Sequence, residues 1–332
     1  MAKVYQANEI KNIALMGGSG SGKTTLMESM LFESGVIKRE AQSTVSDYFP
    51  VEKEYGYSVF STVCNIEFSG KKLNIIDCAG SDDFCGGTVT ALHVVDTAVI
   101  MLTANGGVEV GTQNNFRLAE SSKKPVIFVV NKCDHENANF ERTAEALKDN
   151  FGNKVVLLQY PVNAGAAFNS VIDVLKNKML VWKPEGGAPE YKDVPADQAG
   201  KVEELRGALC EMAAEADEQL MEKFFEEGTL SEAEMLNGLK AVFAEGGVYP
   251  VMCTCGLKDM GARRLMDFLG EMAPAVADAP KPVTKDGDAV AADASKPASM
   301  FIFKTSVEPH IGEVNYFKVM QGTIHAADDM QN

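Results

Sequence analysis

A glycine-rich segment near the start of the chain has the residue types and the spacing of a phosphate-binding loop. Gly17 is followed by Gly22, Lys23 and Thr24 in the pattern G-x-x-x-x-G-K-[ST]. In such a loop backbone N–H groups turn toward the phosphates, the lysine reaches the β- and γ-phosphates, and the hydroxyl binds Mg²⁺. We therefore expect a nucleotide site, lined by Gly17, Gly18, Ser19, Gly20, Ser21, Gly22, Lys23, Thr24 and Thr25.

The segments on either side of these glycines are the ones that a phosphate-binding loop needs. Residues 12–17 form a short apolar run, which predicts a buried strand, and residues 24–34 carry apolar side chains at helical spacing. Gly35 stands where a glycine often closes a helix. A strand, a glycine loop and a helix N-terminus in this order bind anions. This context favours a phosphate site over a turn that contains a lysine by chance.

A second motif, D-x-x-G, follows the apolar run at residues 72–77. Its members are Asp77 and Gly80. An aspartate at the end of such a strand can hold a Mg²⁺-bound water, and the glycine N–H can meet the γ-phosphate. With Thr24, Asp77 is therefore a candidate metal-site residue.

A third motif, N-K-x-D, follows the apolar run at residues 125–131. Asn131, Lys132 and Asp134 supply it. The aspartate can accept hydrogen bonds from guanine N1 and N2, and the lysine can pack on the base. Ligands of open α/β sheets bind at the carboxyl ends of strands, which is where both later motifs fall. The ordered set predicts GTP or GDP as ligand, rather than an adenine nucleotide.

The apolar runs also predict the fold. Their apolarity is continuous, which is typical of strands buried on both faces, and helical patterns separate them, so we expect a doubly wound, mostly parallel α/β sheet. The runs are residues 72–77, 97–104, 125–131, 155–162 and 248–253. Residues 1–275 would form this domain, with an inserted α/β subdomain at about 163–247 that is mostly helical in pattern and is broken at residues 184–200.

The insert contains a strongly acidic stretch. Residues 200–227 hold nine Asp and Glu residues against three Lys and Arg, above apolar residues at helical spacing. We interpret the stretch as one long amphipathic helix with a solvated acidic face. A docking surface for a basic partner is the alternative.

The composition changes after the predicted domain. Residues 276–299 are rich in Ala, Pro, Asp and Lys, as in a linker. Residues 301–324 then alternate apolar and polar side chains around an expected turn at residues 309–312, which predicts two antiparallel strands. An isolated hairpin is marginal in water, so residues 300–332 are interpreted as the start of an all-β barrel domain.

The whole composition narrows the protein class. The chain has 332 residues and a net charge of −16, which argues against simple electrostatic attraction to nucleic acid. It has no long apolar run and no signal-peptide pattern, so we expect no membrane partner and a cytoplasmic location. Seven cysteines suit a reducing compartment. Cys253 and Cys255 have no second pair at zinc-site spacing, and we predict no metal there.

The ordered motifs resemble those of translational GTPases, and among them elongation factor G. Residues 44–59 are similar to the first switch of that family, residues 77–84 to the second switch, and residues 104–120 to the segment after the third strand. Residues 159–175 resemble the entry to the extra subdomain of elongation factor G, and residues 301–324 the opening of its second domain. The resemblance implies a GTP-binding factor that acts on the ribosome in translocation and is a monomer off the ribosome.

The resemblance also assigns the guanine-side loop at residues 249–261. The family has Ser-Ala where this chain has Cys255 and Gly256. The contact to guanine there comes mainly from a backbone N–H, so this difference implies little change in binding.

Other departures from the family pattern affect hydrolysis. The second switch of the family reads D-x-P-G-H, and its histidine orients the attacking water; the matching residue here is Ser81. The first switch ends R-G-I-T in the family, and Tyr55 replaces its arginine, whereas Ser58 keeps a hydroxyl that can bind Mg²⁺. Because phosphoryl transfer depends on positioning and charge stabilisation, these changes predict weak or absent hydrolysis. A relayed water at Ser81, or alignment supplied by the ribosome, is the alternative.

Two other functions share part of this pattern. A P-loop kinase or ATPase would share the first motif only, and Asn131 to Asp134 argue against it. A regulatory module that binds the ribosome with GTP but does not drive translocation would share every motif.

Overall fold

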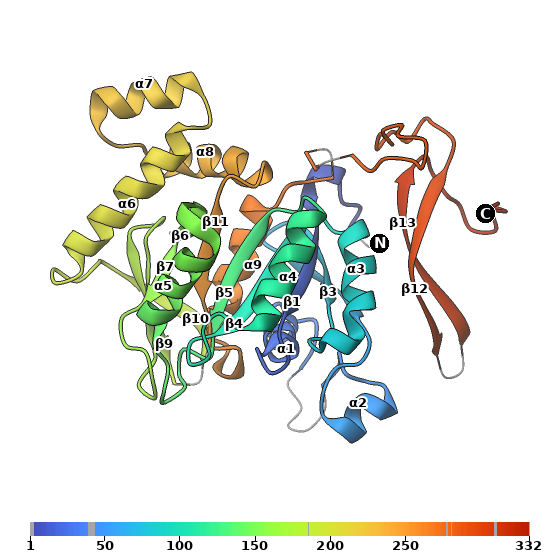
Figure 1. Ribbon diagram of the computed structural model, residues 1–332, viewed down its shortest axis with the longest axis horizontal. Coiled ribbons are helices and arrows are strands. Elements are labelled where there is room, and N and C mark those ends of the chain that lie inside the picture. Colours follow the sequence, from blue (N-terminus) through green and yellow to red (C-terminus); the bar gives the residue numbers. More distant parts are fainter. Residues whose placement is uncertain are drawn as a thin grey trace.

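A computed structural model describes residues 3–38, 44–184, 186–276, 278–279, 281–308 and 311–331. Its centre is a seven-stranded sheet in the order β2-β3-β1-β4-β5-β11-β6 (Figure 1). All its pairings are parallel except the one between β2 and β3. The strands are β1 (Ile10–Gly17), β2 (Thr62–Phe68), β3 (Lys71–Asp77), β4 (Thr97–Thr103), β5 (Val126–Asn131), β6 (Val155–Leu157) and β11 (Tyr249–Cys253).

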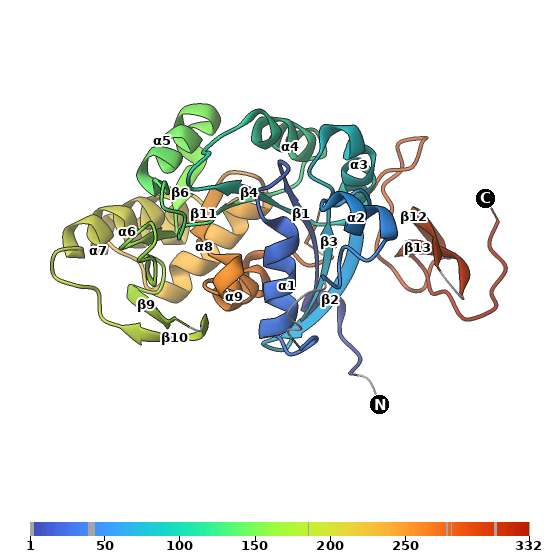
Figure 2. The same ribbon diagram turned by 90° about the horizontal axis from the view of Figure 1, so that it is seen from below.

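Helices cover both faces of this sheet, as the sequence predicted. Figure 2 shows α3, α4 and α5 on one face and α1 and α9 on the other. Their bounds are α1 (Lys23–Glu33), α3 (Cys85–Val94), α4 (Val110–Ser121), α5 (Phe140–Phe151) and α9 (Ala262–Met272). The residues of β5 are buried along its whole length, because helices lie above and below it. The doubly wound α/β prediction is therefore confirmed.

The apolar run at residues 155–162 is not one strand, which corrects our prediction. It divides into β6 in the main sheet and β7 (Gln159–Pro161) in a second sheet. Leu158 lies between the two, and its N–H donates to Val251 O at 3.0 Å. Both short strands are largely buried, so the sequence is apolar on both sides of the bend. The apolar pattern therefore gives no sign of where the chain bends.

The insert has more strand than its sequence indicated. A four-stranded antiparallel sheet in the order β10-β9-β8-β7 includes β8 (Ser170–Asp173), β9 (Lys178–Lys183) and β10 (Gly186–Lys192). Part of the predicted break at residues 184–200 is thus a strand. Three helices follow, α6 (Ala199–Ala214), α7 (Glu218–Glu227) and α8 (Glu232–Ala244). The insert is α/β, and between residues 163 and 247 its helices span more residues than its strands.

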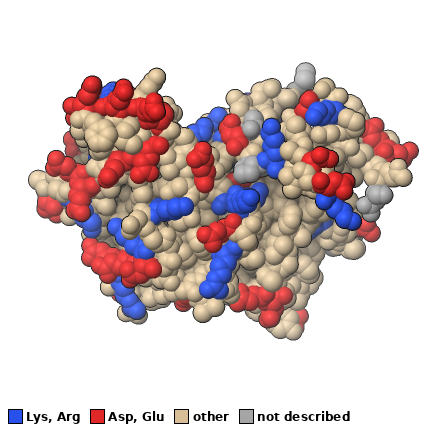
Figure 3. All heavy atoms as spheres, turned by 45° about the horizontal axis from the view of Figure 1, so that its top comes forward, with Lys and Arg blue, Asp and Glu red and all other residues tan. Residues whose placement is uncertain are grey.

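The acidic stretch at residues 200–227 forms two helices, so the prediction of one long helix is wrong. Asp217 stands between α6 and α7, and its side chain accepts a hydrogen bond from Leu220 N at 2.9 Å. This aspartate caps the first turn of α7 and so begins a new helix. The carboxylates of the two helices gather on one lobe of the surface (Figure 3).

The end of the chain forms the predicted antiparallel hairpin, β12 (Ser299–Glu308) and β13 (Gly312–Gln321). Residues 309 and 310 of its expected turn lie outside the described residues. The hairpin contacts the main domain: Lys318 Nζ donates to Val94 O at 2.7 Å, and His93 stacks on Phe301 with ring centroids 5.4 Å apart. Within the described ranges, we find no helix that is long and apolar enough to cross a membrane.

Candidate nucleotide-binding site

The buried side chain of Asn131 joins three segments that are far apart in the sequence. Its Nδ2 donates to Ser21 O at 3.0 Å. Its Oδ1 accepts from Gly256 N at 3.1 Å and from the Thr254 hydroxyl at 3.1 Å. The glycine loop, the end of β5 and the loop after β11 therefore meet at one residue, at the carboxyl edge of the sheet.

The glycine loop leaves no room for side chains at two of its positions. Gly17 has φ +141°, and a Cβ there would overlap Met101 O. Gly22 has φ +90°, and a Cβ there would overlap the Asn131 side chain. Both positions require glycine because of left-handed backbone and close approach. Of the other predicted loop residues, Ser19, Gly20 and Thr25 are exposed.

Lys23 lies inside the loop that it was predicted to serve. Its Nζ donates to Gly17 O at 2.9 Å and to Gly18 O at 3.0 Å. Burial lowers the pKa of this ammonium, and the nearby Asp77 carboxylate acts in the opposite direction. A Cβ on Gly80 would lie close to Lys23 Nζ, so the D-x-x-G motif packs directly against the loop.

Three oxygen-bearing side chains predicted for the metal site lie together. The Thr24 hydroxyl donates to Asp77 Oδ2 at 2.9 Å, and it is 3.0 Å from Ser58 Oγ. Asp77 Oδ1 is buried and has no hydrogen-bond partner among the described residues. Burial raises the pKa of Asp77 to about 7, against the effect of Lys23. Oxygen donors with one unsatisfied carboxylate oxygen fit Mg²⁺, which prefers such ligands.

The predicted base-recognition residues also lie side by side. Asp134 pairs with Lys258, whose Nζ is 3.2 Å from Oδ2. Burial would raise the pKa of Asp134, but hydrogen bonds from Cys255 and Lys258 outweigh it and lower that pKa. The carboxylate is thus charged at neutral pH and can accept two N–H donors. Lys132 follows Asn131 with φ +57°.

Two glutamates that the sequence analysis missed hold the first switch in place. Glu28 of α1 accepts from Val45 N at 2.7 Å and Ser46 N at 2.9 Å. Glu52, in α2 (Pro50–Tyr55), accepts from Val59 N at 3.0 Å and so fixes the backbone next to Ser58. The sequence alone does not predict these hydrogen bonds, because each joins residues that are separated by a loop.

Ser81 and Tyr55, which we interpreted as replacing family residues in the switches, lie at the surface of the site. Ser81 directly precedes the short helix Asp82–Phe84 and is partly exposed. Tyr55 is 60% exposed and lies against Tyr57, with ring centroids 6.0 Å apart. Tyr57 in turn stacks on Phe84 at 6.5 Å. An aromatic row, which the sequence did not predict, thus connects the two switches.

Comparison with known proteins decides the family. The family described as "Elongation factor Tu GTP binding domain" matches residues 8–275. The chain belongs to this family. Guanine nucleotide binding is the property that membership implies.

Individual relatives agree with this assignment. The chain is 32% identical to an elongation factor G-like protein of Thermotoga maritima over 97% of its own length and 47% of that protein. A crystal structure of a protein from Thermus thermophilus matches with a TM-score of 0.84 and 27% identity, over 97% of this chain and 47% of the other. The chain thus spans about half the length of these relatives, and it is a divergent member that resembles elongation factor G.

Proposed function

We propose that this chain is the GTP-binding part of a translation factor that resembles elongation factor G and acts on the ribosome in translocation. The observation that carries the proposal is the convergence at Asn131, which joins the phosphate loop to the base-recognition loop. A site with a phosphate loop at one end and a base-recognition loop at the other fits a guanine nucleotide, with GTP and GDP as the two bound forms. We place the protein in the cytoplasm, as a monomer off the ribosome.

Each end of the site has its own task. At the phosphate end, Lys23 and the loop N–H groups bind the β- and γ-phosphates, and Gly80 N–H meets the γ-phosphate. Thr24, Ser58 and Asp77 would hold Mg²⁺, which would neutralise phosphate charge. At the base end, Asp134 accepts from guanine N1 and N2, Lys132 packs on the ring, and the loop that contains Cys255 and Gly256 lies beside the base.

Hydrolysis is expected to be weak. Ser81 stands where the family places the histidine that orients water, and a serine hydroxyl is shorter and cannot act as an imidazole. Loss of such a positioned group costs roughly 10² to 10⁴ in rate. Tyr55 also brings no positive charge to the switch.

Single-turnover GTP cleavage in the presence of ribosomes tests this part of the proposal. Ser81→His is expected to cleave GTP faster than the wild type, because it restores the missing imidazole. The matched control, Ser81→Ala, should cleave no faster than the wild type. Equal rates for the wild type and Ser81→His would contradict weak hydrolysis and indicate that water is positioned by another group.

A regulatory module without translocation activity is the second candidate. The serine at position 81 favours it, because a factor that binds GTP and cleaves it slowly would stay in its bound state. Cosedimentation with ribosomes in a nonhydrolysable GTP analogue, followed by a translocation assay on the full-length protein, separates the two. Ribosome binding without translocation would support the module.

A further inference from the structure

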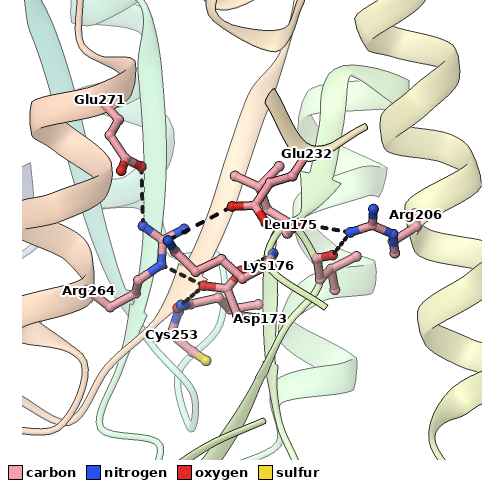
Figure 4. A network of polar contacts seen from close by, with 10 residues as sticks. Asp173, Leu175, Lys176, Arg206, Glu232, Cys253, Arg264 and Glu271 are labelled. Carbon is pink, nitrogen blue, oxygen red and sulfur yellow. Dashed lines mark hydrogen bonds and ion pairs between the residues drawn. The ribbon is translucent and has the colours of Figure 1, made fainter. Parts of the chain in front are cut away.

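A buried polar network connects the insert with the loop proposed to hold the guanine base. Arg264 of α9 and Asp173 of β8 form its ion pair, with Nε and Oδ2 2.6 Å apart and side chains only 2% and 1% exposed. Figure 4 shows the Arg264 side chain extending from α9 to Asp173, with Cys253 close by. A buried ion pair contributes little net stability, so we ask whether this pair fixes the position of neighbouring side chains.

The network exists because a strand of the main sheet ends early. Strand β6 pairs with β11 only as far as Leu157, opposite Val251. The chain then leaves for the second sheet, although β11 continues to Cys253. On the other side of β11, Thr254 N donates to Val130 O of β5. Because N–H groups alternate along a strand, the N–H of Cys253 faces the side that β6 has left.

The Gln159 side chain takes the place of the missing strand. Its Oε1 accepts from Cys253 N at 3.4 Å, and all the atoms involved are buried. Its Nε2 donates to Asp173 Oδ2 at 3.1 Å. Asp173 therefore fixes which end of the amide faces Cys253, and Arg264 Nε donates to the same oxygen, Asp173 Oδ2, at 2.6 Å.

The end of β11 at Cys253 leads directly into the loop that is proposed to hold the guanine base. Thr254 and Gly256, the residues just after Cys253, both donate to Asn131 Oδ1 at 3.1 Å. Cys255 between them hydrogen-bonds Asp134. A shift of the Cys253 backbone would thus move the residues that are proposed to face the base.

We propose that Gln159 is a positioning residue for guanine recognition, held in its working orientation by the buried Asp173–Arg264 pair of the insert and helix α9. The inference rests on the proposed function of the site, and it adds that the insert contributes to the choice of base. Gln159 does not itself touch the nucleotide; it acts through the Cys253 backbone.

The test compares GDP with inosine diphosphate, which lacks the 2-amino group that Asp134 is proposed to bind. The variant Gln159→Met removes the acceptor for Cys253 N–H but keeps the side-chain length. We expect its GDP affinity to fall by about tenfold, because the strand end that positions the base-recognition loop loses its support. The affinity for inosine diphosphate should fall less, so that the ratio of the two affinities shrinks.

Arg206→Met is the matched control. Arg206 of α6 donates to Val174 O at 2.9 Å and to Leu175 O at 2.8 Å within the same insert, and neither bond is to Gln159, Asp173 or Cys253 (Figure 4). Its loss should lower stability and leave the affinity ratio unchanged. Isothermal titration calorimetry of both variants and the wild type gives the ratios.

A rescue variant keeps the test valid if Gln159→Met does not fold. Gln159→Glu puts two carboxylates side by side, whereas Gln159→Glu with Asp173→Asn restores one charge and one amide. We expect the double variant to recover the affinity ratio that Gln159→Glu loses.

Two results would overturn the inference: a ratio unchanged in folded Gln159→Met, or a double variant no better than Gln159→Glu. Failure of the wild type to bind GDP would instead overturn the proposed function, so the two failures are distinguishable.

Discussion

In the proposed site, the choice of base depends most directly on Asp134. Its carboxylate lies in a partly buried position, paired with Lys258 and hydrogen-bonded by Cys255. A charged acceptor at this position can bind two N–H donors of guanine, but it repels a carbonyl oxygen at the same place. The preference for guanine is therefore a matter of donor and acceptor order at one side chain.

Asp134→Asn tests this residue. An asparagine loses one acceptor oxygen and gains an N–H₂ donor, so GDP affinity is expected to fall by roughly 10² to 10⁴, for two charge-assisted hydrogen bonds. Xanthosine diphosphate, which has a carbonyl in place of the 2-amino group, should bind the variant better than it binds the wild type. Fluorescence titration with both nucleotides measures this, and an unchanged order of preference would contradict the assignment of Asp134.

At the scale of elements, the hairpin β12–β13 touches the first switch. The Tyr48 hydroxyl donates to Glu308 Oε1 at 2.8 Å, and Lys304 Nζ donates to Ser61 O at 2.6 Å. Tyr48 lies in the first switch before Ser58, and Ser61 lies two residues after the end of this switch. The beginning of the second domain is thus in contact with the segment that would respond to the γ-phosphate.

A double-mutant cycle on Tyr48→Phe and Glu308→Ala tests this contact. We expect a coupling of about 1 kcal/mol in the free energy of unfolding, because the two changes remove the same hydrogen bond. Urea denaturation of the wild type, both single variants and the double variant gives the value. Additive effects would show that the two elements are not coupled through this pair.

The start of β1 is joined to the end of α9 by a buried lysine. Lys11 Nζ donates to Ala273 O at 2.6 Å, and burial lowers its pKa to about 8. The unfolded chain keeps the ordinary value near 10.4, so between these pH values the unfolded state binds more protons than the folded state. This lysine therefore makes stability increase as pH rises from about 8 to about 10.4.

Lys11→Met removes this pH dependence. The wild type should gain stability relative to the variant as pH rises across that window. Below the window the difference in stability should stay constant. Urea denaturation at pH 7, 8, 9 and 10 measures the difference. A difference that does not vary with pH would show that Lys11 titrates normally.

For the molecule as a whole, short sequence motifs predicted the nucleotide site. Contacts between residues far apart in the chain were not predicted. Gly17, Asp77 and Asn131 are each the last residue of a strand, and parallel strands bring their ends together. Gln159 carries no such pattern, since its partner Cys253 is 94 residues away. The bend at Leu158 and the break at Asp217 were missed because apolarity and acidity continue across them.

Charge is also distributed unevenly over the molecule. The acids of α6 and α7 lie on the insert and gather on one lobe of the surface (Figure 3), whereas the phosphates would bind at the carboxyl edge of the main sheet. This separation allows a chain with a net charge of −16 to hold a polyanionic nucleotide, because the local groups are Lys23, loop N–H groups and a metal site.

The central claim is that this chain binds guanine nucleotides through one site that spans the loop at Lys23 and the loop at Asp134. Equilibrium competition tests it most directly: a fluorescent GDP analogue is bound to the purified protein with Mg²⁺ and displaced by unlabelled nucleotides. We expect displacement by GTP and GDP at low concentration and none by ATP at the same concentrations. Displacement by ATP as readily as by GTP would contradict it.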